Sequence, residues 1–142
     1  MKKQYLLPVL FLFVLSSFYG CKKTTIDPRE KFLGKYTGTI SVSIPTLIPT
    51  PLTQAYEPTI TKSTTNPNEI LIDGNAATVV GNTYIYDEFT ETGDVPQLGT
   101  AVATFNGSGV LNGNSLSESG TVKVIIQGMT YNGTWTSTAV KQ

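Results

Sequence analysis

Apolar and polar positions alternate along most of this chain after Gly34. In residues 35–44 an apolar residue or a glycine stands at every second position, with polar residues between them. Successive side chains of a β-strand point to opposite faces, so this period of two predicts a strand with one buried face. The same pattern predicts strands at 70–73, 76–80, 82–89, 101–105, 109–111, 121–127 and 130–138, and one more containing Leu116.

Turn-forming residues separate these runs. Asn106-Gly107 and Asn112-Gly113 predict two tight hairpin turns, because asparagine and glycine adopt the backbone angles that such turns need. Residues 45–58 contain four prolines and predict a long connection or covering flap, since proline cannot donate to a central sheet ladder. Residues 90–99 predict a second loop. Asp27-Pro28-Arg29-Glu30 predicts a helical start of one or two turns, which Gly34 ends.

Short strands punctuated by glycine and asparagine indicate an all-β domain. We expect residues 32–142 to form a small antiparallel meander β-barrel, preceded by a short helical turn. A β-sandwich is the alternative that the pattern leaves open.

The N-terminus has the form of a secretory signal. Lys2 and Lys3 precede an uncharged and mostly apolar stretch, residues 5–19, which ends at Gly20-Cys21. These 15 residues are fewer than the roughly 20 that a membrane-spanning helix needs. The stretch therefore predicts the apolar region of a signal peptide.

The segment Ser17-Phe18-Tyr19-Gly20-Cys21 resembles the lipobox of bacterial lipoproteins, in the relaxed form typical of the Bacteroidota. The resemblance implies cleavage between Gly20 and Cys21 and lipidation of Cys21. Residues 1–20 would then be the signal peptide and 21–31 a lipidated linker with the helical turn. Lys22 follows the cysteine in place of an inner-membrane retention aspartate, which implies the outer membrane, with the periplasmic face favoured over the cell surface.

Two further segments resemble known families. Gly34-Lys35-Tyr36 is similar to the Gly-x-Trp opening of lipocalins, with Tyr36 in place of the tryptophan. Residues 107–116 are similar to a segment of many small Bacteroidota lipoproteins. Both resemblances imply a lipocalin-like (calycin) barrel.

Composition excludes several classes of function. The 142 residues contain ten basic and ten acidic side chains, one cysteine and no histidine. Without histidine, no Ser-His-Asp or Cys-His catalytic unit and no Cys/His zinc site is available. A single cysteine forms no internal disulfide, and the low basic content argues against nucleic-acid binding. Removal of residues 1–20 would leave a basic N-terminal segment and an acidic body.

Aromatic residues are the candidate ligand-lining positions. Tyr84 and Tyr86 share one strand face, as do Tyr131 and Trp135, and Tyr36 lies at the start of the first strand. Aromatic side chains on one face can line an apolar pocket or stack on sugars. Filling of the barrel interior is the alternative for all five.

Four carboxylates lie close together in the sequence, at Asp87, Glu88, Glu91 and Asp94. Solvated loop charge is the simplest interpretation. A Ca²⁺ site is an alternative, because carboxylate oxygens are its ligands. A glycosidase pair is another, although adjacent residues such as Asp87 and Glu88 point to opposite faces of a strand.

We therefore expect a lipid-anchored, non-catalytic envelope protein without a cofactor. Its expected role is to bind a small apolar molecule or a glycan at the open end of the barrel. The first alternative is an accessory subunit that docks to an envelope protein complex. The second is a carboxylate-dependent hydrolase.

Overall fold

The computed structural model describes residues 26–95 and 99–142. Within them, one 3-10 turn, η1 (Glu30–Phe32), precedes ten strands. The strands are β1 (Gly34–Ser43), β2 (Leu52–Tyr56), β3 (Thr59–Lys62), β4 (Glu69–Ile72), β5 (Asn75–Val80), β6 (Thr83–Tyr86), β7 (Phe89–Val95), β8 (Gly99–Asn112), β9 (Ser115–Ile126) and β10 (Met129–Lys141). The predicted helical turn and all-β class are confirmed.

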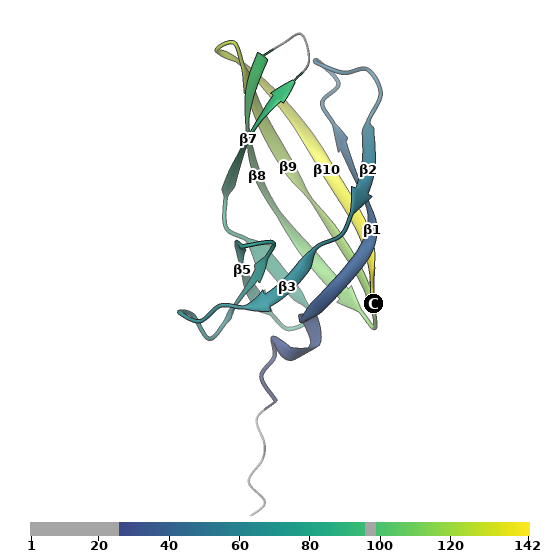
Figure 1. The fold of residues 1–142 in the computed structure, drawn as a ribbon, viewed down its shortest axis with the longest axis vertical. Helices are drawn as coiled ribbons and strands as arrows, with labels where there is room; N and C mark the ends of the chain where they lie inside the picture. Colours follow the sequence, from purple (N-terminus) through teal and green to yellow (C-terminus); the bar gives the residue numbers. More distant parts are fainter. Residues whose placement is uncertain (1–25, 96–98) are drawn as a thin grey trace, which may run out of the picture.

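These strands form one antiparallel sheet that closes on itself (Figure 1). Neighbours follow the order β10-β9-β8-β6-β5-β4-β3-β1, and β1 pairs again with β10. The closing pair runs from Tyr36 opposite Lys141 to Ser43 opposite Thr134. Because the first and last strands of the ring are hydrogen-bonded, the sheet is a meander barrel and not a sandwich of two layers. The barrel prediction is confirmed.

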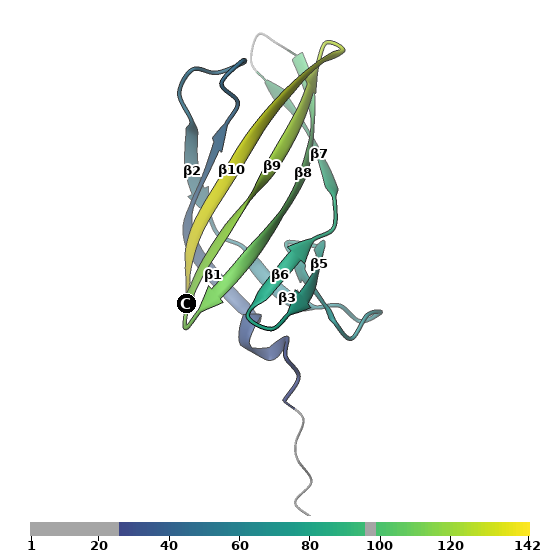
Figure 2. The same cartoon turned by 180° about the vertical axis from the view of Figure 1, so that it is seen from behind.

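Alternating burial explains why the long strands form. Along β9, the side chains of Leu116, Glu118, Val122, Val124 and Ile126 are buried, and the outward residues Ser117, Ser119, Thr121, Lys123 and Ile125 are exposed. One face of the strand thus removes apolar surface from water while the other stays solvated. Burial of each large apolar side chain stabilises the folded state by roughly 1.5–3 kcal/mol. Figure 2 shows β8, β9 and β10 as one continuous wall of the barrel.

The predicted turn at Asn106-Gly107 is wrong, because β8 continues through it to a turn at Gly113. Gly107 and Gly120 face each other across β8 and β9. A Cβ atom on Gly107 would lie 2.8 Å from the Trp135 ring, and one on Gly120 would lie 2.7 Å from Trp135 Nε1. The Trp135 indole also donates to the Asn106 carbonyl at 3.0 Å. These two glycines allow the Trp135 indole to pack closely on β8 and β9, and they do not form a turn.

The barrel has two unlike halves along its axis. In the closed half, β3, β4, β5 and β6 complete the ring, with β6 paired to residues 108–110 of β8. In the open half, β7 pairs with residues 99–105 of β8, and β2 pairs with residues 38–42 of β1. Among the described residues, β2 and β7 each have one neighbouring strand, and they lie on opposite sides of the upper barrel in Figure 1. We call the gap in hydrogen bonding between them the seam.

The predictions of loops at 45–58 and 90–99 are wrong in part, because each segment contains a strand along the seam. The segment 45–58 contains β2, whose five residues fall between Pro51 and Pro58 and include no proline. The segment 90–99 is mostly β7. Each is an edge strand, and edge strands tolerate flanking prolines and exposed polar side chains.

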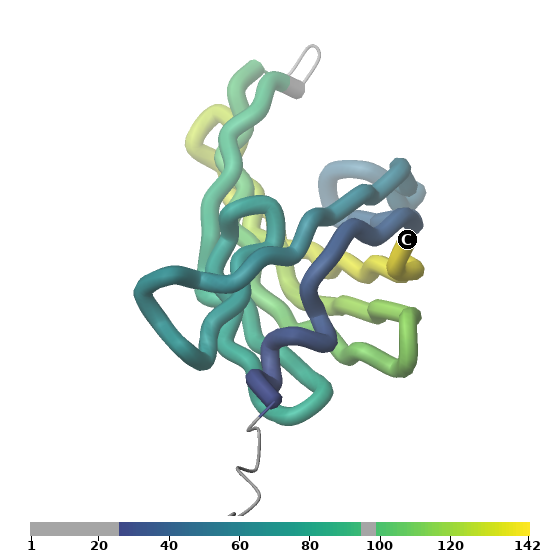
Figure 3. The backbone as a smooth tube through the Cα atoms, turned by 60° about the horizontal axis from the view of Figure 1, so that its bottom comes forward, coloured from purple at the N-terminus to yellow at the C-terminus, as the bar shows by residue number. Residues whose placement is uncertain are grey.

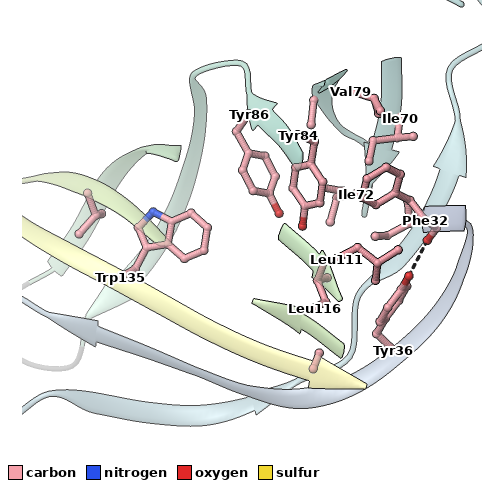
Figure 4. Close-up of a cluster of buried hydrophobic side chains, with 14 of the residues drawn as sticks. Phe32, Tyr36, Ile70, Ile72, Val79, Tyr84, Tyr86, Leu111, Leu116 and Trp135 are labelled. Carbon is pink, nitrogen blue, oxygen red and sulfur yellow. Dashed lines mark hydrogen bonds between the residues drawn. The ribbon is translucent and has the colours of Figure 1, made fainter. Parts of the chain in front are cut away.

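The closed half is filled by a compact apolar core (Figure 4). Phe32, Tyr36, Ile70, Tyr84 and Leu116 are at most 1% exposed. The Tyr36 hydroxyl donates to the Phe32 carbonyl at 2.8 Å, which holds η1 against β1. The core therefore seals this end of the barrel.

The described chain begins at the same closed end, as the view in Figure 3 shows. Arg29 donates to the carbonyls of Ser63 at 3.2 Å and Asn66 at 3.0 Å, in the β3–β4 connection. It also forms an ion pair with Asp27 at 2.8 Å, and its hydrogen bonds hold the pKa of that carboxyl well below its usual range. Lys62 pairs with both Asp27 and Glu30. The N-terminal segment is thus fixed to the closed end.

Candidate ligand-binding site

An apolar cavity of about 440 Å³ occupies the open half, and we call it the upper cavity. It extends from β2 to β7 across the inner faces of β1, β8 and β9. Most of its lining is aliphatic, from Val42, Ile44, Leu47, Ile48, Leu52, Ala101, Ala103, Val122, Val124 and Ile126, with Phe105 as its aromatic member. Small side chains on β8, Ala101 and Ala103, leave this space unfilled.

A second cavity of about 150 Å³ lies deeper, and we call it the middle cavity. It shares Val42, Gln54, Glu91 and Phe105 with the upper cavity, so the two adjoin. Its remaining walls are more aromatic and more polar, formed by Ile40, Tyr56, Ile72, Asp73, Asn75, Tyr86, Phe89 and Trp135. The recess therefore changes from aliphatic near the seam to aromatic near the closed core.

A chain of aromatic rings joins this recess to the core. Phe105 stacks on Phe89 at 5.3 Å between ring centroids, and Phe89 contacts Tyr86 at 5.5 Å. Tyr86 also meets Trp135 and Tyr84 edge to face, at 5.8 and 5.5 Å. Such pairs stabilise by about 0.5–1.5 kcal/mol each beyond area burial, so these rings are fixed in orientation.

A buried carboxylate, Glu118 on β9, lies behind the rings. Its side chain is 4% exposed and accepts hydrogen bonds at Oε1 from the hydroxyls of Tyr84 and Tyr86, each at 2.5 Å. The Ser137 hydroxyl donates to Oε2. A buried carboxylate is stabilised only when its oxygens are hydrogen-bonded, and here three hydroxyls serve that purpose.

The same burial changes the tyrosines. Desolvation raises the pKa values of Tyr84 and Tyr86 far above the ordinary value, and the negative charge of Glu118 raises them further. The Tyr56 hydroxyl lies beside Tyr86 and Glu118, and its pKa is raised for the same two reasons. All three phenols are therefore hydrogen-bond donors over the whole physiological pH range.

The structure separates the five predicted aromatic residues. Tyr86 and Trp135 line the middle cavity. Tyr36 and Tyr84 belong to the closed core and line neither of the two cavities, so the core interpretation holds for them. Tyr131 is half-buried on β10, and its hydroxyl donates to the sulfur of Met129 at 3.6 Å.

The predicted acidic group is also divided. Asp87 and Glu88 lie in the β6–β7 join, whereas Glu91 and Asp94 line the upper cavity. Asp94 accepts a hydrogen bond from Thr100 at 2.8 Å. Across the part of the chain that the structure describes, no three histidine, cysteine or acidic side chains converge as metal ligands. The geometry gives no support to the calcium alternative.

Glu118 is the residue that the sequence analysis missed, although a signal for it exists. Leu116, Gly120 and Val122 flank it at steps of two, so it stands at an inward position of a predicted strand. A charged residue at an inward position is an exception to the alternation and marks a buried polar site.

Cys21 and Gly20, the predicted lipidation and cleavage residues, lie outside the described residues. Between residues 26 and 142, apart from 96–98, no helix is long and apolar enough to cross a bilayer.

Comparison with known proteins adds one distant likeness. No family model and no curated protein matches the chain. A solved structure of a protein of unknown function, from the DUF3598 family of Nostoc punctiforme, is similar over 80% of this chain and 48% of that one. The sequence identity is 13% and the TM-score is 0.43. This chain spans about half the length of that protein, and the likeness is too distant to bear on function.

Proposed function

We propose that the domain is a non-catalytic binding module for a small apolar molecule, held in the recess formed by the upper and middle cavities. The observation that carries the proposal is the aliphatic cavity of about 440 Å³. Ligand pockets of proteins commonly measure about 300–1,000 Å³ and are lined mainly by apolar side chains. The aliphatic walls favour an apolar occupant over a glycan, whose hydroxyls would need many polar partners.

Trp135 supplies a direct test, because it is the single tryptophan of the chain and lines the middle cavity. It is 4% exposed and borders the middle cavity, so a quencher bound in the recess lies close to its ring. The full chain, in nanodiscs of a neutral lipid, is titrated with 12-bromododecanol while tryptophan emission is measured. We expect saturable quenching, with empty nanodiscs used to correct for partition into lipid.

Two substitutions on β8 form a matched pair for this test. Ala103→Leu adds bulk inside the upper cavity, whereas Thr104→Leu adds it on the opposite, outer face of the same strand. We expect Ala103→Leu to weaken quenching at least about tenfold and Thr104→Leu to leave it unchanged. Absence of saturable quenching in the unsubstituted protein would contradict the proposed function.

We also propose that Cys21 is lipidated and that the protein is anchored to the outer membrane. The lipobox resemblance supports this, and it is compatible with the described chain starting at Ile26, next to Asp27, whose ion pair with Lys62 lies at the closed end. Five residues span at most about 18 Å, so the anchor would hold the closed end near the bilayer. The test is labelling with a palmitate analogue, which Cys21→Ser should abolish. Label retained by Cys21→Ser would refute the anchor.

Docking to an envelope protein is the second candidate, favoured by the unpaired edges of β2 and β7. An exposed strand edge can accept a strand from a partner. A photo-crosslinking residue at Thr92 on β7, with Thr136 on β10 as the control, tests it in living cells. Crosslinks to one protein from Thr92 alone, together with no quenching of Trp135, would favour docking over ligand binding.

A further inference from the structure

The charges of the described residues are distributed unevenly along the barrel. Arg29, Lys31, Lys62 and Lys141 make their recorded polar contacts at the closed end, with partners in η1, the N-terminal segment and the connections there. Lys123 is exposed between buried neighbours on β9 and so points outward. None of the lysines and arginines in residues 26–95 and 99–142 lines the upper or the middle cavity. The described walls of the recess thus lack basic side chains.

Carboxylates, by contrast, lie at the recess. Glu91 lines both cavities, Asp94 lines the upper one and Asp73 the middle one. Asp73 accepts a backbone hydrogen bond from Thr59 at 2.8 Å. Every ion pair recorded in the described ranges involves Asp27 or Glu30 at the closed end, so none of these three carboxylates is neutralised by a basic partner there.

Glu91 occupies a particular position. It is two residues beyond Phe89, which packs against the core, so both side chains are on the inner face of β7. Inner positions of a barrel strand are normally apolar. Within the described residues Glu91 has no hydrogen-bond or ion-pair partner, and it contacts the apolar space of both cavities. The Glu91 side chain is exposed at the open edge of β7, so its carboxylate is solvated and can pair with an occupant that brings the opposite charge.

The wall of the middle cavity also favours a positively charged occupant. The aromatic faces of Tyr86, Phe89 and Trp135 border the middle cavity, and cations are attracted to such faces. Glu118 lies directly behind Tyr86, to which it is hydrogen-bonded. Both the seam and the floor of the recess therefore stabilise a positive charge and oppose a negative one.

We propose that the occupant of the recess is a cationic amphiphile, with an aliphatic body in the upper cavity and a positively charged group beside Glu91. This inference rests on the proposed binding function and narrows it to one chemical class. A fatty acid, which shares the aliphatic body, is disfavoured because its carboxylate would meet Glu91 and Asp94 without a basic partner.

Three probes with one chain length test the charge. The full chain in neutral nanodiscs is titrated with 12-bromododecyltrimethylammonium, 12-bromododecanol and 12-bromododecanoate, below their micelle concentrations, with quenching of Trp135 as the readout. We expect the cation to bind at least about tenfold more tightly than the anion at low salt, with the difference shrinking toward 1 M salt.

A matched pair of variants locates the effect. Glu91→Gln and Glu88→Gln each remove one negative charge, but only Glu91 lines the cavities. We expect Glu91→Gln to reduce the preference for the cation over the anion at least about threefold, and Glu88→Gln to reduce it far less. Binding of the neutral alcohol to Glu88→Gln, whose changed residue lines neither cavity, should not change and is the control for folding.

The outcomes are distinct. If the alcohol quenches but the cation and anion bind equally, or the anion binds better, the inference is overturned and the proposed function stands. Equal losses of preference in Glu88→Gln and Glu91→Gln would also overturn it, because net charge alone would then explain the selectivity. If none of the three probes quenches Trp135, the proposed function itself fails.

Discussion

The closed and open halves of the barrel are built on the same long strands, yet one is solid and the other is hollow. In the closed half, large inward side chains such as Tyr84 and Leu116 meet a complete ring of hydrogen-bonded strands. In the open half, β8 presents Ala101 and Ala103, and the ring is interrupted at the seam. The comparison teaches that one small sheet can hold a solid core at one end of its axis and a hollow recess at the other.

The largest expected effect is alkaline unfolding. Tyr56, Tyr84 and Tyr86 form a cluster around Glu118, and this cluster requires that their hydroxyls stay protonated. Tyr56, Tyr84 and Tyr86 have pKa values raised by burial in the folded protein, whereas unfolded tyrosine ionises near pH 10. Above pH 10 the unfolded state loses protons that the folded state keeps. Stability, intact below pH 10, should then fall as the pH rises, with these three tyrosines contributing about 4 kcal/mol for each pH unit.

Denaturant titrations at several pH values measure this slope. Tyr86→Phe should lower it by about 1.4 kcal/mol for each pH unit, because one of the raised ionisations is removed and those of Tyr36, Tyr56 and Tyr84 remain. A slope unchanged in Tyr86→Phe would show that the cluster does not govern alkaline stability.

Next in size is the effect of one identical truncation in each half. Ile70 is fully buried in the closed core, and Ile126 lines the upper cavity. We expect Ile70→Ala to lower the free energy of unfolding by about 3–5 kcal/mol and Ile126→Ala by about 1–2 kcal/mol, because the space beside Ile126 is already unfilled. Equal losses in urea-induced unfolding would mean that the two halves are packed alike.

A smaller effect is expected from the hydroxyl at Ser137. It is buried and donates to Glu118, whereas Ser119, the outward neighbour of Glu118 on β9, is exposed. Ser137→Ala should cost about 1–3 kcal/mol, since a carboxylate oxygen loses its donor, and Ser119→Ala should stay within about 0.5 kcal/mol. Thermal unfolding of the two variants decides between a structural cluster and an incidental contact.

The smallest effect is expected at Glu91 in the seam. Because it has no partner among the described residues, Glu91→Gln should change the free energy of unfolding by less than about 0.5 kcal/mol. A clear loss of stability would show that Glu91 supports the fold and would remove it as a binding residue.

Local alternation predicted much of the fold, because a period of two reports which face of a strand is buried. It found β1 and β10, and with them the inward position of Trp135, but it divided β9 into one strand at 121–127 and another containing Leu116. It failed where a residue serves a distant partner. Gly107 has the form of a turn residue, yet its role is to admit the Trp135 ring from β10.

The candidate site was predictable only in part, for a related reason. Tyr86 and Trp135 are aromatic and inward, so composition and period identify them. Neither property reveals that, among the described residues, β2 and β7 each pair with one strand only, because that depends on which strands meet across the whole ring. The cavity thus depends on how the strands pair around the barrel, and the alternation within single strands does not predict it.

The joins between β2 and β3 and between β6 and β7 affect how wide an occupant the recess can hold. Residues 57–58 and 87–88 each join a strand bonded on both sides to a strand bonded on a single side, β3 to β2 and β6 to β7. The width between β2 and β7 is therefore set by side-chain packing and not by a ladder of fixed length. We expect the recess to bind occupants of different width, with an affinity that changes gradually with width, because its walls can move apart. A rigid pocket would instead exclude every occupant above one width.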